Sequence, residues 1–521
     1  MSEKNTYYIT TAIDYVNAAP HLGHAYEKIA TDVMARFQRL LGREVFFLTG
    51  TDEHGTKVEK TAKARGITPR EHTDELVEEF KKAWQYLNLT YDRFIRTTDA
   101  DHYAVVEHLW RTLAAKGDIE KRSYQGLYCS GCEKFMTERD LNEAGECPFH
   151  DRKPELVEEE NYFFKLSKYK DAIAEHIRKN PDFVLPEFRA EEVLKMLEDV
   201  EDISVSRHRD SVSWGIPVPD DAEQVIYVWI DALSNYITGV GYRKDDALFH
   251  KFWPADVHMI GKDILRFHAI YWPAMLMSAN IPLPRQIFAH GFININDAKI
   301  SKSVGNVVSP FTLRERFDLP NPDPIRYYLM TVATFGQDGG FTEDDFKLKV
   351  NADLANNLGN LLNRTLNMTN KYFEGQVPAS GHARPGVLHA EGVDEVRQAY
   401  ESYDFQKAAE LILQLVDWAN KEINDKEPWT LAKEGKTQEL SDLMYTVLET
   451  LRQVAIMLSP ITPTLSDEIW TQLGYPATLS VLDPRWSDIS SANIPPGQRI
   501  NLQGPILPRL DSELAGASKK K

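Results

Sequence analysis

The chain has 521 residues, a length that predicts several domains. Its formal net charge of −18 at pH 7 excludes a generally basic nucleic-acid binder, so any RNA must be bound through local patches. Its three cysteines cannot form a complete set of disulfides, and we expect a reducing, cytoplasmic environment. The sequence shows neither a secretory signal nor an uninterrupted apolar span, so we expect no membrane partner.

The first hundred residues alternate apolar strands with helical patterns. Strands are predicted at residues 7–13, 44–48 and 93–96, and a helix with Ile29 and Val33 on its apolar face follows the first strand. This rhythm predicts an α/β fold with a doubly wound parallel sheet of the Rossmann type. In such a sheet, ligands bind beyond the carboxyl ends of the strands.

The turn before this helix has a composition that suits an anion. Pro20 leads into His21, Gly23 and His24, where backbone N–H groups and the positive end of the helix dipole converge. The glycine lets a phosphate approach closely, and the imidazoles add N–H donors. Two ordinary surface or helix-capping histidines are the alternative, which this pattern taken alone favours.

A second loop at the same sheet edge begins at Asp52, directly after an apolar strand. A carboxylate in this place can hold a substrate amino group. The alternative is a helix N-cap, which is a common role for aspartate at such a position.

The alternation stops near residue 116, and a region with paired cysteines follows. Cys129 and Cys132 form one pair, and Cys147 and His150 repeat the same internal spacing. Four such ligands match one tetrahedral structural zinc (Zn²⁺) and leave no open position for chemistry. Three buried cysteines acting as small hydrophobes are the alternative, but they leave the equal spacing unexplained. We therefore predict a zinc-binding insertion that splits the sheet over residues 116–224.

The strand and helix rhythm returns in the second half of the sheet. Strands are predicted at residues 225–230, 256–260 and 287–289, with one helix beginning near 231 and another running from 261 to 277. The strand ends bring Trp229, Asp263 and His290 to the edge that the first half also uses.

A loop with two lysines follows the last of these strands. Lys299 and Lys302 are three residues apart among small hydroxyl residues, which suits a mobile loop that closes on polyphosphate. A solvated loop with two surface lysines is the alternative. With the histidine pair, the chain resembles the class I aminoacyl-tRNA synthetases, whose HIGH and KMSKS motifs match residues 21–24 and 299–303 with one conservative change each.

Helical patterns dominate beyond residue 344 and continue at 395–423 and 440–458, consistent with a bundle. A row of asparagines lies on one face beside Arg364, at positions Asn356, Asn360, Asn363 and Asn367. Asparagine is a poor interior helix residue, so the row indicates a surface that reads hydrogen-bonding edges. A polar seam packed against another segment is an equally open alternative. The tail after residue 508 is predicted to be disordered.

The resemblance narrows to the bacterial methionyl-tRNA synthetases with one zinc, and it extends to about residue 500. Carried by residues 11–17, 227–233 and 428–429 among others, it implies that Asp52 holds the α-ammonium of methionine. It also implies that the side chain is enclosed by Ile13, Tyr15, Trp229, Ala232, Leu233, Tyr236 and His290. Sulfur beside aromatic rings gains roughly 0.3–1.5 kcal/mol per contact, which agrees with this set.

The resemblance implies an ATP-dependent aminoacyl-tRNA ligase acting on methionine and on initiator and elongator tRNA(Met). ATP, with Mg²⁺ on its phosphates, is met by His21, Gly23, His24, Gly261, Asp263, Lys299 and Lys302. The zinc ligands are Cys129, Cys132, Cys147 and His150. Asn360 and Arg364 read the anticodon with Trp429, which follows Pro428 where a helix is expected to stop.

Three alternatives are weaker on the same sequence. A synthetase for valine, isoleucine or leucine would carry a large editing insertion, a nucleotidyltransferase would lack the helical domain and the zinc insertion, and a catalytically inactive tRNA binder would not keep both phosphate motifs. We expect a monomer. The predicted divisions are residues 1–115 and 225–291 for the two catalytic halves, 116–224 for the insertion, 292–350 for the KMSKS and stem-contact region, 351–505 for the anticodon domain and 506–521 for the tail.

Overall fold

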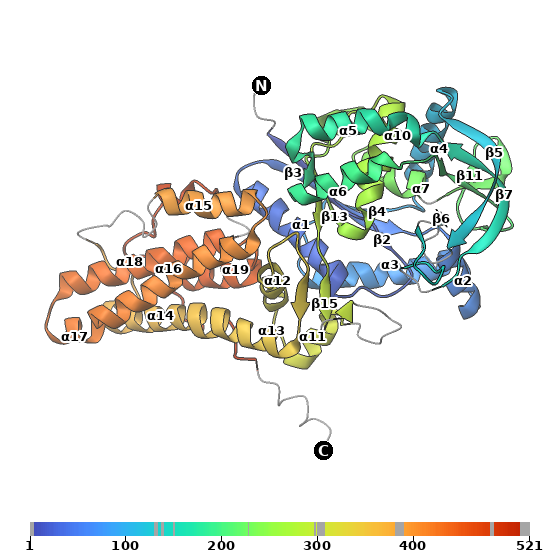
Figure 1. Ribbon diagram of the computed structural model, residues 1–521. Helices are drawn as coiled ribbons and strands as arrows, with labels where there is room; N and C mark the ends of the chain where they lie inside the picture. Colours follow the sequence, from blue (N-terminus) through green and yellow to red (C-terminus); the bar gives the residue numbers. More distant parts are fainter. Residues whose placement is uncertain are drawn as a thin grey trace, which may run out of the picture.

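The computed structural model describes residues 5–129, 134–136, 140–148, 152–227, 229–295, 298–299, 308–380, 390–479 and 484–510. Figure 1 shows an α/β lobe at one end, an elongated helical lobe at the other, and a middle region around α12 and β15 between them. Among the helices so described, none has the length and apolar character needed to cross a lipid bilayer.

The α/β lobe is organised around one parallel sheet. Its central strand, β1 (Thr6–Thr11), pairs with β3 (Glu44–Asp52) on one side and with β13 (Val257–Gly261) on the other. The remaining strands are β2 (Asp14–Tyr15) and β4 (Arg93–Arg96) beside β3, then β14 (Ile287–His290) and β8 (Val184–Leu185) beyond β13. All these pairs are parallel, which confirms the predicted parallel α/β core.

Helices cover both faces of this sheet because side chains alternate along each strand. Ile9 packs in the hydrophobic core that includes α1 (Leu22–Leu40), whereas its neighbour Tyr8 packs in a second core with α4 (Ala100–Ala115) and α10 (Trp272–Ala279). The other covering helices are α2 (Thr56–Arg65), α3 (Pro69–Tyr86), α7 (Trp229–Leu233), α8 (Asn235–Gly239) and α9 (Asp246–Phe252).

Two small antiparallel sheets interrupt the parallel one. The first contains β6 (Lys134–Met136), β5 (Ile119–Cys129), β7 (Glu155–Phe164) and β9 (Ile203–Ser204), and the second β10 (Ser206–His208), β12 (Asp221–Ile226) and β11 (Ile216–Val218). Between β7 and β9 of the first sheet the chain forms α5 (Lys170–Lys179) and α6 (Glu187–Glu198), and there β8 returns to the edge of the parallel sheet beside β14. The stretch predicted as an insertion therefore also contributes a strand to the parallel sheet.

The helical lobe is a bundle that follows a short linking region. The link contains β15 (Ile293–Ile295), β16 (Ala298–Lys299), α11 (Pro310–Phe317), α12 (Asp323–Thr331), β17 (Gly339–Phe341) and α13 (Glu343–Val350). The bundle contains α14 (Asn360–Phe373), α15 (Ala390–Glu401), α16 (Phe405–Lys426), α17 (Pro428–Lys433), α18 (Thr437–Leu458) and α19 (Pro463–Gln472). A helical C-terminal domain is thus confirmed.

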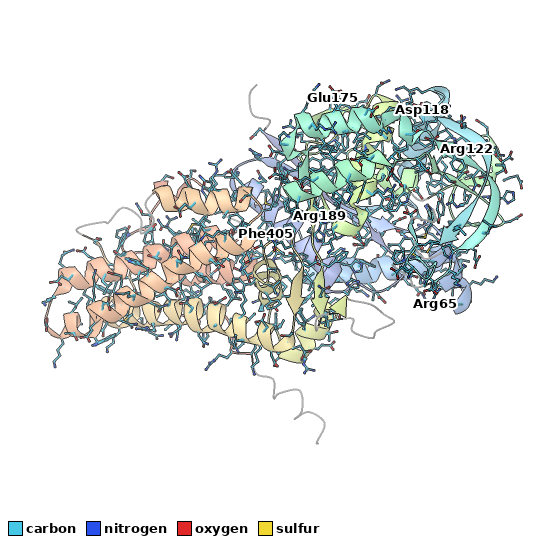
Figure 2. The ribbon with its side chains drawn as sticks, viewed as in Figure 1. Arg65, Asp118, Arg122, Glu175, Arg189 and Phe405 are labelled. Atoms are coloured by element: carbon cyan, nitrogen blue, oxygen red, sulfur yellow. The ribbon has the colours of Figure 1, made fainter. Side chains whose placement is uncertain are left out.

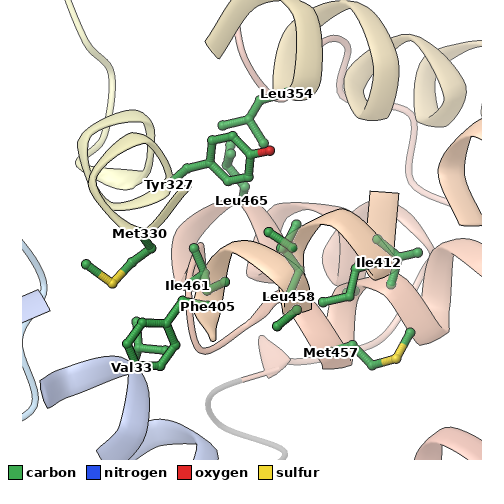
Figure 3. Close-up of a cluster of buried hydrophobic side chains, with 14 of the residues drawn as sticks. Val33, Tyr327, Met330, Leu354, Phe405, Ile412, Met457, Leu458, Ile461 and Leu465 are labelled. Carbon is green, nitrogen blue, oxygen red and sulfur yellow. The ribbon is translucent and has the colours of Figure 1, made fainter. Parts of the chain in front are cut away.

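The two lobes share one hydrophobic core. Figure 3 shows Val33 of α1 beside Met330 of α12 and Phe405 of α16, all of which are buried. A fully buried ion pair lies in the same junction, where Arg326 Nη2 is 2.8 Å from Asp32 Oδ2. Arg326 also donates to backbone carbonyls of both lobes, at Leu87 and Ile461. These contacts fix the helical lobe against the helix that begins at His21.

Three predicted boundaries are wrong. The strand predicted at 225–230 ends at Ile226, and α7 already begins at Trp229, because a short apolar run fits a buried helix as well as a strand. The helix predicted at 261–277 is a 3₁₀ turn, a π-helical turn at Phe267–Tyr271 and then α10. The pattern at 395–423 is two helices, separated near Tyr403, which has a φ of 61°.

Candidate active site

The N-terminus of α1 is held by its two histidines. The backbone N–H of Gly23 donates to His21 Nδ1 at 3.1 Å, and the backbone N–H of His21 donates to His24 Nδ1 at 3.2 Å. The ring centroids are 3.9 Å apart. Because each Nδ1 accepts a backbone hydrogen bond, each neutral ring carries its proton on Nε2. The two histidines therefore do cap the helix, as the alternative prediction had it. Capping leaves the Nε2–H group of each ring available as a hydrogen-bond donor.

His24 is neutral near pH 7. Burial lowers the pKa of its imidazole well below the usual value, and electrostatic interactions with His21 and Lys28 act in the same direction. A neutral imidazole can donate from Nε2 while Nδ1 remains an acceptor, which is what the cap requires.

A chain of buried charges lies behind these histidines and was missed in the sequence. His290 Nε2, at the end of β14, is 3.0 Å from Glu27 Oε2, and Glu27 Oε1 is 2.8 Å from Lys28 Nζ. Lys28 Nζ also lies 2.8 Å from Asp14 Oδ1 and donates to the carbonyl of Ala12. The chain connects α1 with the ends of β14 and β1. Charged residues on the otherwise apolar inner face of α1 were the signal that could have revealed it.

The protonation state of this chain follows from its neighbours. Burial acts to raise the pKa of Glu27, but the Lys28 ammonium and the His290 imidazole outweigh it and lower the value to about 2. His290 Nδ1 lies 2.7 Å from the carbonyl oxygen of Gly291. Both nitrogens of His290 therefore face oxygen acceptors, one of them the Glu27 carboxylate.

Gly261 ends β13 at the same edge of the sheet. A Cβ atom there would lie 2.8 Å from Asp263 Oδ1 and 3.8 Å from His290 Cε1. A larger residue would therefore push the Asp263 carboxylate aside, whereas the Cβ distance to His290 is an ordinary van der Waals contact. The structure thus brings Asp263, His290 and the α1 N-terminus to one edge, as the sequence predicted.

The aromatic side chains predicted to enclose a substrate side chain belong to two cores: Tyr15 packs against the first, whereas Tyr236 lies in the second and Trp229 packs against it. The rings of Trp229 and Phe267 are stacked with centroids 3.4 Å apart. Trp229 and Ile13 are partly buried against the core that contains Leu233 and Tyr236. Ala232 is 6% exposed and follows the buried Asp231 on α7.

The hydroxyl of Tyr236 has a partner within the protein. It lies 2.7 Å from His268 Nε2, and because His268 Nδ1 faces the carbonyl of Ile264, Nε2 is the acceptor. Burial lowers the pKa of His268 to about 4, so this ring is neutral. Tyr236 and His290 thus both direct their donors at acceptors within the protein and would not also donate a hydrogen bond to a thioether. They contribute surface and dipoles instead.

Asp52 lies at the carboxyl end of β3, where it is paired with Tyr15 of the neighbouring strand β2. The helix that follows, α2, is capped by Gly55 rather than by Asp52, so the capping alternative for this carboxylate is wrong. The next two residues, Glu53 and His54, are buried. Asp52 itself is only half-buried at the sheet edge.

Several predicted residues lie outside the described part of the chain. Lys302, Cys132 and His150 are among them. Lys299 is the last residue of β16, whose backbone pairs with β15 at Asn294. Cys129 and Cys147 are described and both are buried in one small cluster with Met136.

The residues predicted to read an anticodon lie on the helical lobe. Arg364 Nη2 donates to Asn424 Oδ1 at 2.9 Å across α14 and α16, and Asn360 is exposed on the same helix as Arg364. Trp429 is 46% exposed. As predicted, it follows the end of a helix, because α16 ends at Lys426 with Glu427 as its C-cap at a φ of 43°. The sequence did not predict that a further helix, α17, begins at Pro428. Asn424 was missed because no spacing pattern joins it to Arg364.

Comparisons with known proteins identify the family of the chain. Residues 7–152 and 143–366 match the family described as "tRNA synthetases class I (M)", and residues 389–502 match the "Anticodon-binding domain of tRNA ligase". A methionine–tRNA ligase of Clostridium perfringens is 46% identical over 98% of this chain and 79% of its own length. One of Thermotoga maritima is 45% identical over 90% of this chain and 75% of its own.

A solved structure resembles the whole chain. The structure of Mycobacterium tuberculosis methionyl-tRNA synthetase in complex with methionyl-adenylate has a TM-score of 0.91 and 40% sequence identity. The match covers 97% of this chain and 100% of that one, so it includes both lobes.

Proposed function

The chain belongs to the class I methionyl-tRNA synthetases and is a methionine–tRNA ligase, and from that premise we propose the role of each residue at its sheet edge. The enzyme joins methionine to ATP and then transfers the methionyl group to tRNA. The observation that carries the assignment of roles is the convergence of the α1 N-terminus, Asp263 and the Glu27–His290 pair at the carboxyl ends of parallel strands.

ATP lies over the N-terminus of α1. The Nε2–H groups of His21 and His24 meet its phosphates, and Gly23 keeps the approach open. Gly261 and Asp263 hold the ribose or adenine, and Lys299 and Lys302 close over the leaving pyrophosphate. Class I synthetases use Mg²⁺, which enters with the ATP phosphates and neutralises part of their charge.

Methionine lies beside the ATP, with its ammonium on Asp52. Its thioether packs against the aromatic surface of Trp229 and Tyr236, which is supported by their place at the sheet edge. The substrate side chain is further enclosed by Ile13, Tyr15, Ala232, Leu233 and His290. Leu233 and Tyr236 are almost completely buried, at 2% and 1% exposure, so their pocket is rigid.

The first reaction forms methionyl-adenylate. A methionine carboxylate oxygen attacks the α-phosphorus of ATP, the bond to the bridging oxygen breaks, and pyrophosphate leaves with that electron pair. The nucleophile is already ionised, so no general base is needed. Neutral His24 and its neighbour His21 donate hydrogen bonds to the phosphate oxygens as charge grows on them. A hydroxyl oxygen of the terminal ribose of tRNA(Met), initiator or elongator, then attacks the methionyl carbonyl carbon. The bond from that carbon to the phosphate oxygen breaks, AMP leaves with its electron pair, and the hydroxyl proton passes to the leaving phosphate or to solvent.

A single structural zinc is held by Cys129, Cys132, Cys147 and His150. Two of these thiols are buried in one small cluster, which fits soft ligands that share an ion. Because ligand binding and folding are coupled in such a region, Cys147→Ser should weaken transfer to tRNA more than adenylate formation. Elemental analysis checks the metal, and a zinc-free wild-type protein with normal transfer contradicts it.

The helical lobe binds the anticodon through Asn360, Arg364 and Trp429. Support comes from the match of residues 389–502 to an anticodon-binding domain and from the exposed indole of Trp429. We further propose that the protein is a cytoplasmic monomer with the divisions predicted above. The odd number of cysteines supports the cytoplasmic location, and the helical bundle that follows α13 supports the divisions.

The reaction is tested by ATP–pyrophosphate exchange with each of the twenty amino acids, without tRNA. We expect exchange with methionine and at most weak exchange with the others. The same assay on Trp229→Ala tests the pocket, because loss of the indole should raise the KM for methionine and leave the KM for ATP near that of the wild type.

A further inference from the structure

A buried cluster of three side chains lies behind the proposed methionine pocket. Asp231 Oδ2 is 2.6 Å from His54 Nδ1, and Asp231 Oδ1 is 2.9 Å from His102 Nε2. The exposed fractions of the three side chains are 4% for His54, 1% for Asp231 and 0% for His102. One carboxylate therefore bridges two imidazoles that come from different parts of the chain.

The three residues join three elements of the α/β lobe. His54 is two residues beyond Asp52 in the loop after β3, Asp231 is on α7, and His102 is on α4. The other ring nitrogen of His102 lies 3.3 Å from Thr238 Oγ1 on α8. The other ring nitrogen of His54 lies 3.1 Å from the hydroxyl of Tyr103 on α4. Both imidazoles are thus fixed at both of their nitrogens.

Asp231 faces away from the pocket. On a helix, it lies about 200° around the axis from Trp229, whereas Ala232 and Leu233 lie within about 60° of Trp229. The pocket residues therefore share one face of α7, and Asp231 anchors the opposite face. Asp231 cannot touch the substrate from that side, so any effect on methionine binding must be indirect.

The loop after β3 is also held to the sheet. Arg96 Nε and Nη2 donate to the two carboxylate oxygens of Glu53 at 2.6 and 2.8 Å, and Trp214 Nε1 donates to the Glu53 carbonyl at 2.6 Å. These bonds fix Glu53 but do not reach α7. The bond between His54 and Asp231 joins the loop to that helix.

We propose that His54, Asp231 and His102 form a clamp that sets the distance between the Asp52 carboxylate and the aromatic face of α7. The clamp rests on the proposed pocket, in which Asp52 holds the ammonium of methionine and Trp229 packs on its side chain. These two groups grip opposite ends of one small substrate, so a small change in their separation weakens both contacts together. Asp231 is thus a positioning residue for amino-acid recognition.

The test compares Asp231→Asn with a matched control, Asp118→Asn. Asp118 is also buried and accepts hydrogen bonds from Lys168, Tyr169 and Ser278, and it is labelled in Figure 2. Those partners are not part of the pocket. Both variants lose one buried carboxylate of similar connectivity, so both should lower the melting temperature.

Methionine binding separates the two variants. In ATP–pyrophosphate exchange, Asp231→Asn should raise the KM for methionine by about tenfold, because a charge-assisted hydrogen bond is lost. The KM for ATP should stay near the wild-type value, and kcat within about threefold of it. Asp118→Asn should leave both KM values unchanged. A lower melting temperature with an unchanged methionine KM in Asp231→Asn would overturn the clamp, as would equal rises in both KM values.

A second pair of variants covers poor folding of Asp231→Asn. His102→Gln keeps an N–H donor that can reach Asp231, whereas His102→Ala removes it, so His102→Ala should raise the methionine KM more than His102→Gln. Equal KM values in this pair would also overturn the clamp. Trp229→Ala distinguishes the two failures: if it raises the methionine KM while the Asp231 and His102 variants do not, the pocket stands and the clamp is wrong. If Trp229→Ala leaves that KM unchanged, the pocket and the clamp both fail.

Discussion

The adenylate site in the α/β lobe and the proposed anticodon surface in the helical lobe are built in opposite ways. Around the first, charged groups are buried and paired, as in the Glu27–Lys28 contact, whose side chains are 8% and 1% exposed. On the second, Trp429 is 46% exposed, and the half-buried Arg364 donates a hydrogen bond to Asn424, an exposed amide.

The difference follows from what each region has to bind. Adenylate formation needs donors that are already aimed at a small transition state, and buried ion pairs keep them aimed. An anticodon is a large, partly unstacked ligand, and exposed amides and aromatic rings can adapt to its bases. The shared core shown in Figure 3 and the buried Arg326–Asp32 pair join the two regions. Substitutions in one region can be compared with substitutions in the other through their effects on stability, adenylate formation and aminoacylation of tRNA.

The largest effect is expected from the buried charge chain. Glu27→Ala leaves His290 and Lys28 without one of their buried partners, and breaking such a pair should cost about 3–5 kcal/mol of the free energy of unfolding. Urea unfolding measures this cost. Glu78→Ala is the matched control, because Glu78 also pairs with a lysine but on the surface, and it should change the stability little.

The Glu27 contribution also has a defined pH dependence. The folded pKa of about 2 lies below the unfolded value near 4.5, so ionised Glu27 stabilises the fold above pH 4.5, and this contribution is lost as the pH falls towards 2. The difference in melting temperature between wild type and Glu27→Gln should therefore narrow on acidification. A difference that stays constant from pH 6 to pH 3 contradicts the buried pairing.

The strand ends could be predicted from the sequence because a parallel sheet places every carboxyl end at one edge. His21, Asp52, Asp263 and His290 each follow an apolar run, and local pattern was enough to bring them together. The partners that hold them could not be predicted in this way. Glu27 and His290 are 263 residues apart, and no local rule pairs them.

Backbone conformations set a second limit. The helix stop predicted before Trp429 is found at Glu427, but the new helix α17 that begins at Pro428 was not predicted. Glu427 joins the two helices with a positive φ, a conformation that glycine or asparagine usually marks in a sequence and glutamate does not. Trp229 was assigned to a strand because residues 225–230 are apolar throughout, and such a run carries no period that separates a strand from a buried helix.

The second largest effect is expected at Lys302, in the loop that should close over pyrophosphate. Removing one donor aimed at developing charge costs about 2.7–4 kcal/mol, so Lys302→Ala should lower the adenylation rate by about a hundredfold or more. Single-turnover formation of adenylate measures it, and methionine affinity should hardly change. Lys371→Ala, an exposed lysine of the helical lobe, is the control. Wild-type rates for Lys302→Ala would remove this lysine from the mechanism.

A smaller effect is expected at Trp429, and it should appear in one reaction only. Loss of stacking on one base costs about 1–3 kcal/mol, so Trp429→Ala should weaken aminoacylation of tRNA while ATP–pyrophosphate exchange without tRNA is unchanged. Leu502→Ala, which removes another exposed apolar side chain, should leave both activities as they are. If Trp429→Ala lowers the melting temperature and both activities together, the indole has a packing role instead.

The smallest effect is expected at Asn424, which holds Arg364 on the proposed anticodon surface. Their hydrogen bond is 2.9 Å long and lies at the surface, so its loss in Asn424→Ala should cost about 0.5–1.5 kcal/mol in the aminoacylation of tRNA. If Asn424 acts by orienting Arg364, it has nothing to orient once that arginine is gone. The double variant with Arg364→Ala should then be no worse than Arg364→Ala alone.

Asn367→Ala is the matched control for that cycle, because Asn367 is exposed on α14, the helix that carries Arg364. In the described part of the chain its side chain bonds to Asn363 of that same helix. We expect it to leave the aminoacylation of tRNA unchanged. Additive losses in the double variant would mean that Asn424 and Arg364 contact the tRNA independently. In that case the bond between them in the free protein is incidental, and the surface is even less preorganised than its contrast with the adenylate site implies.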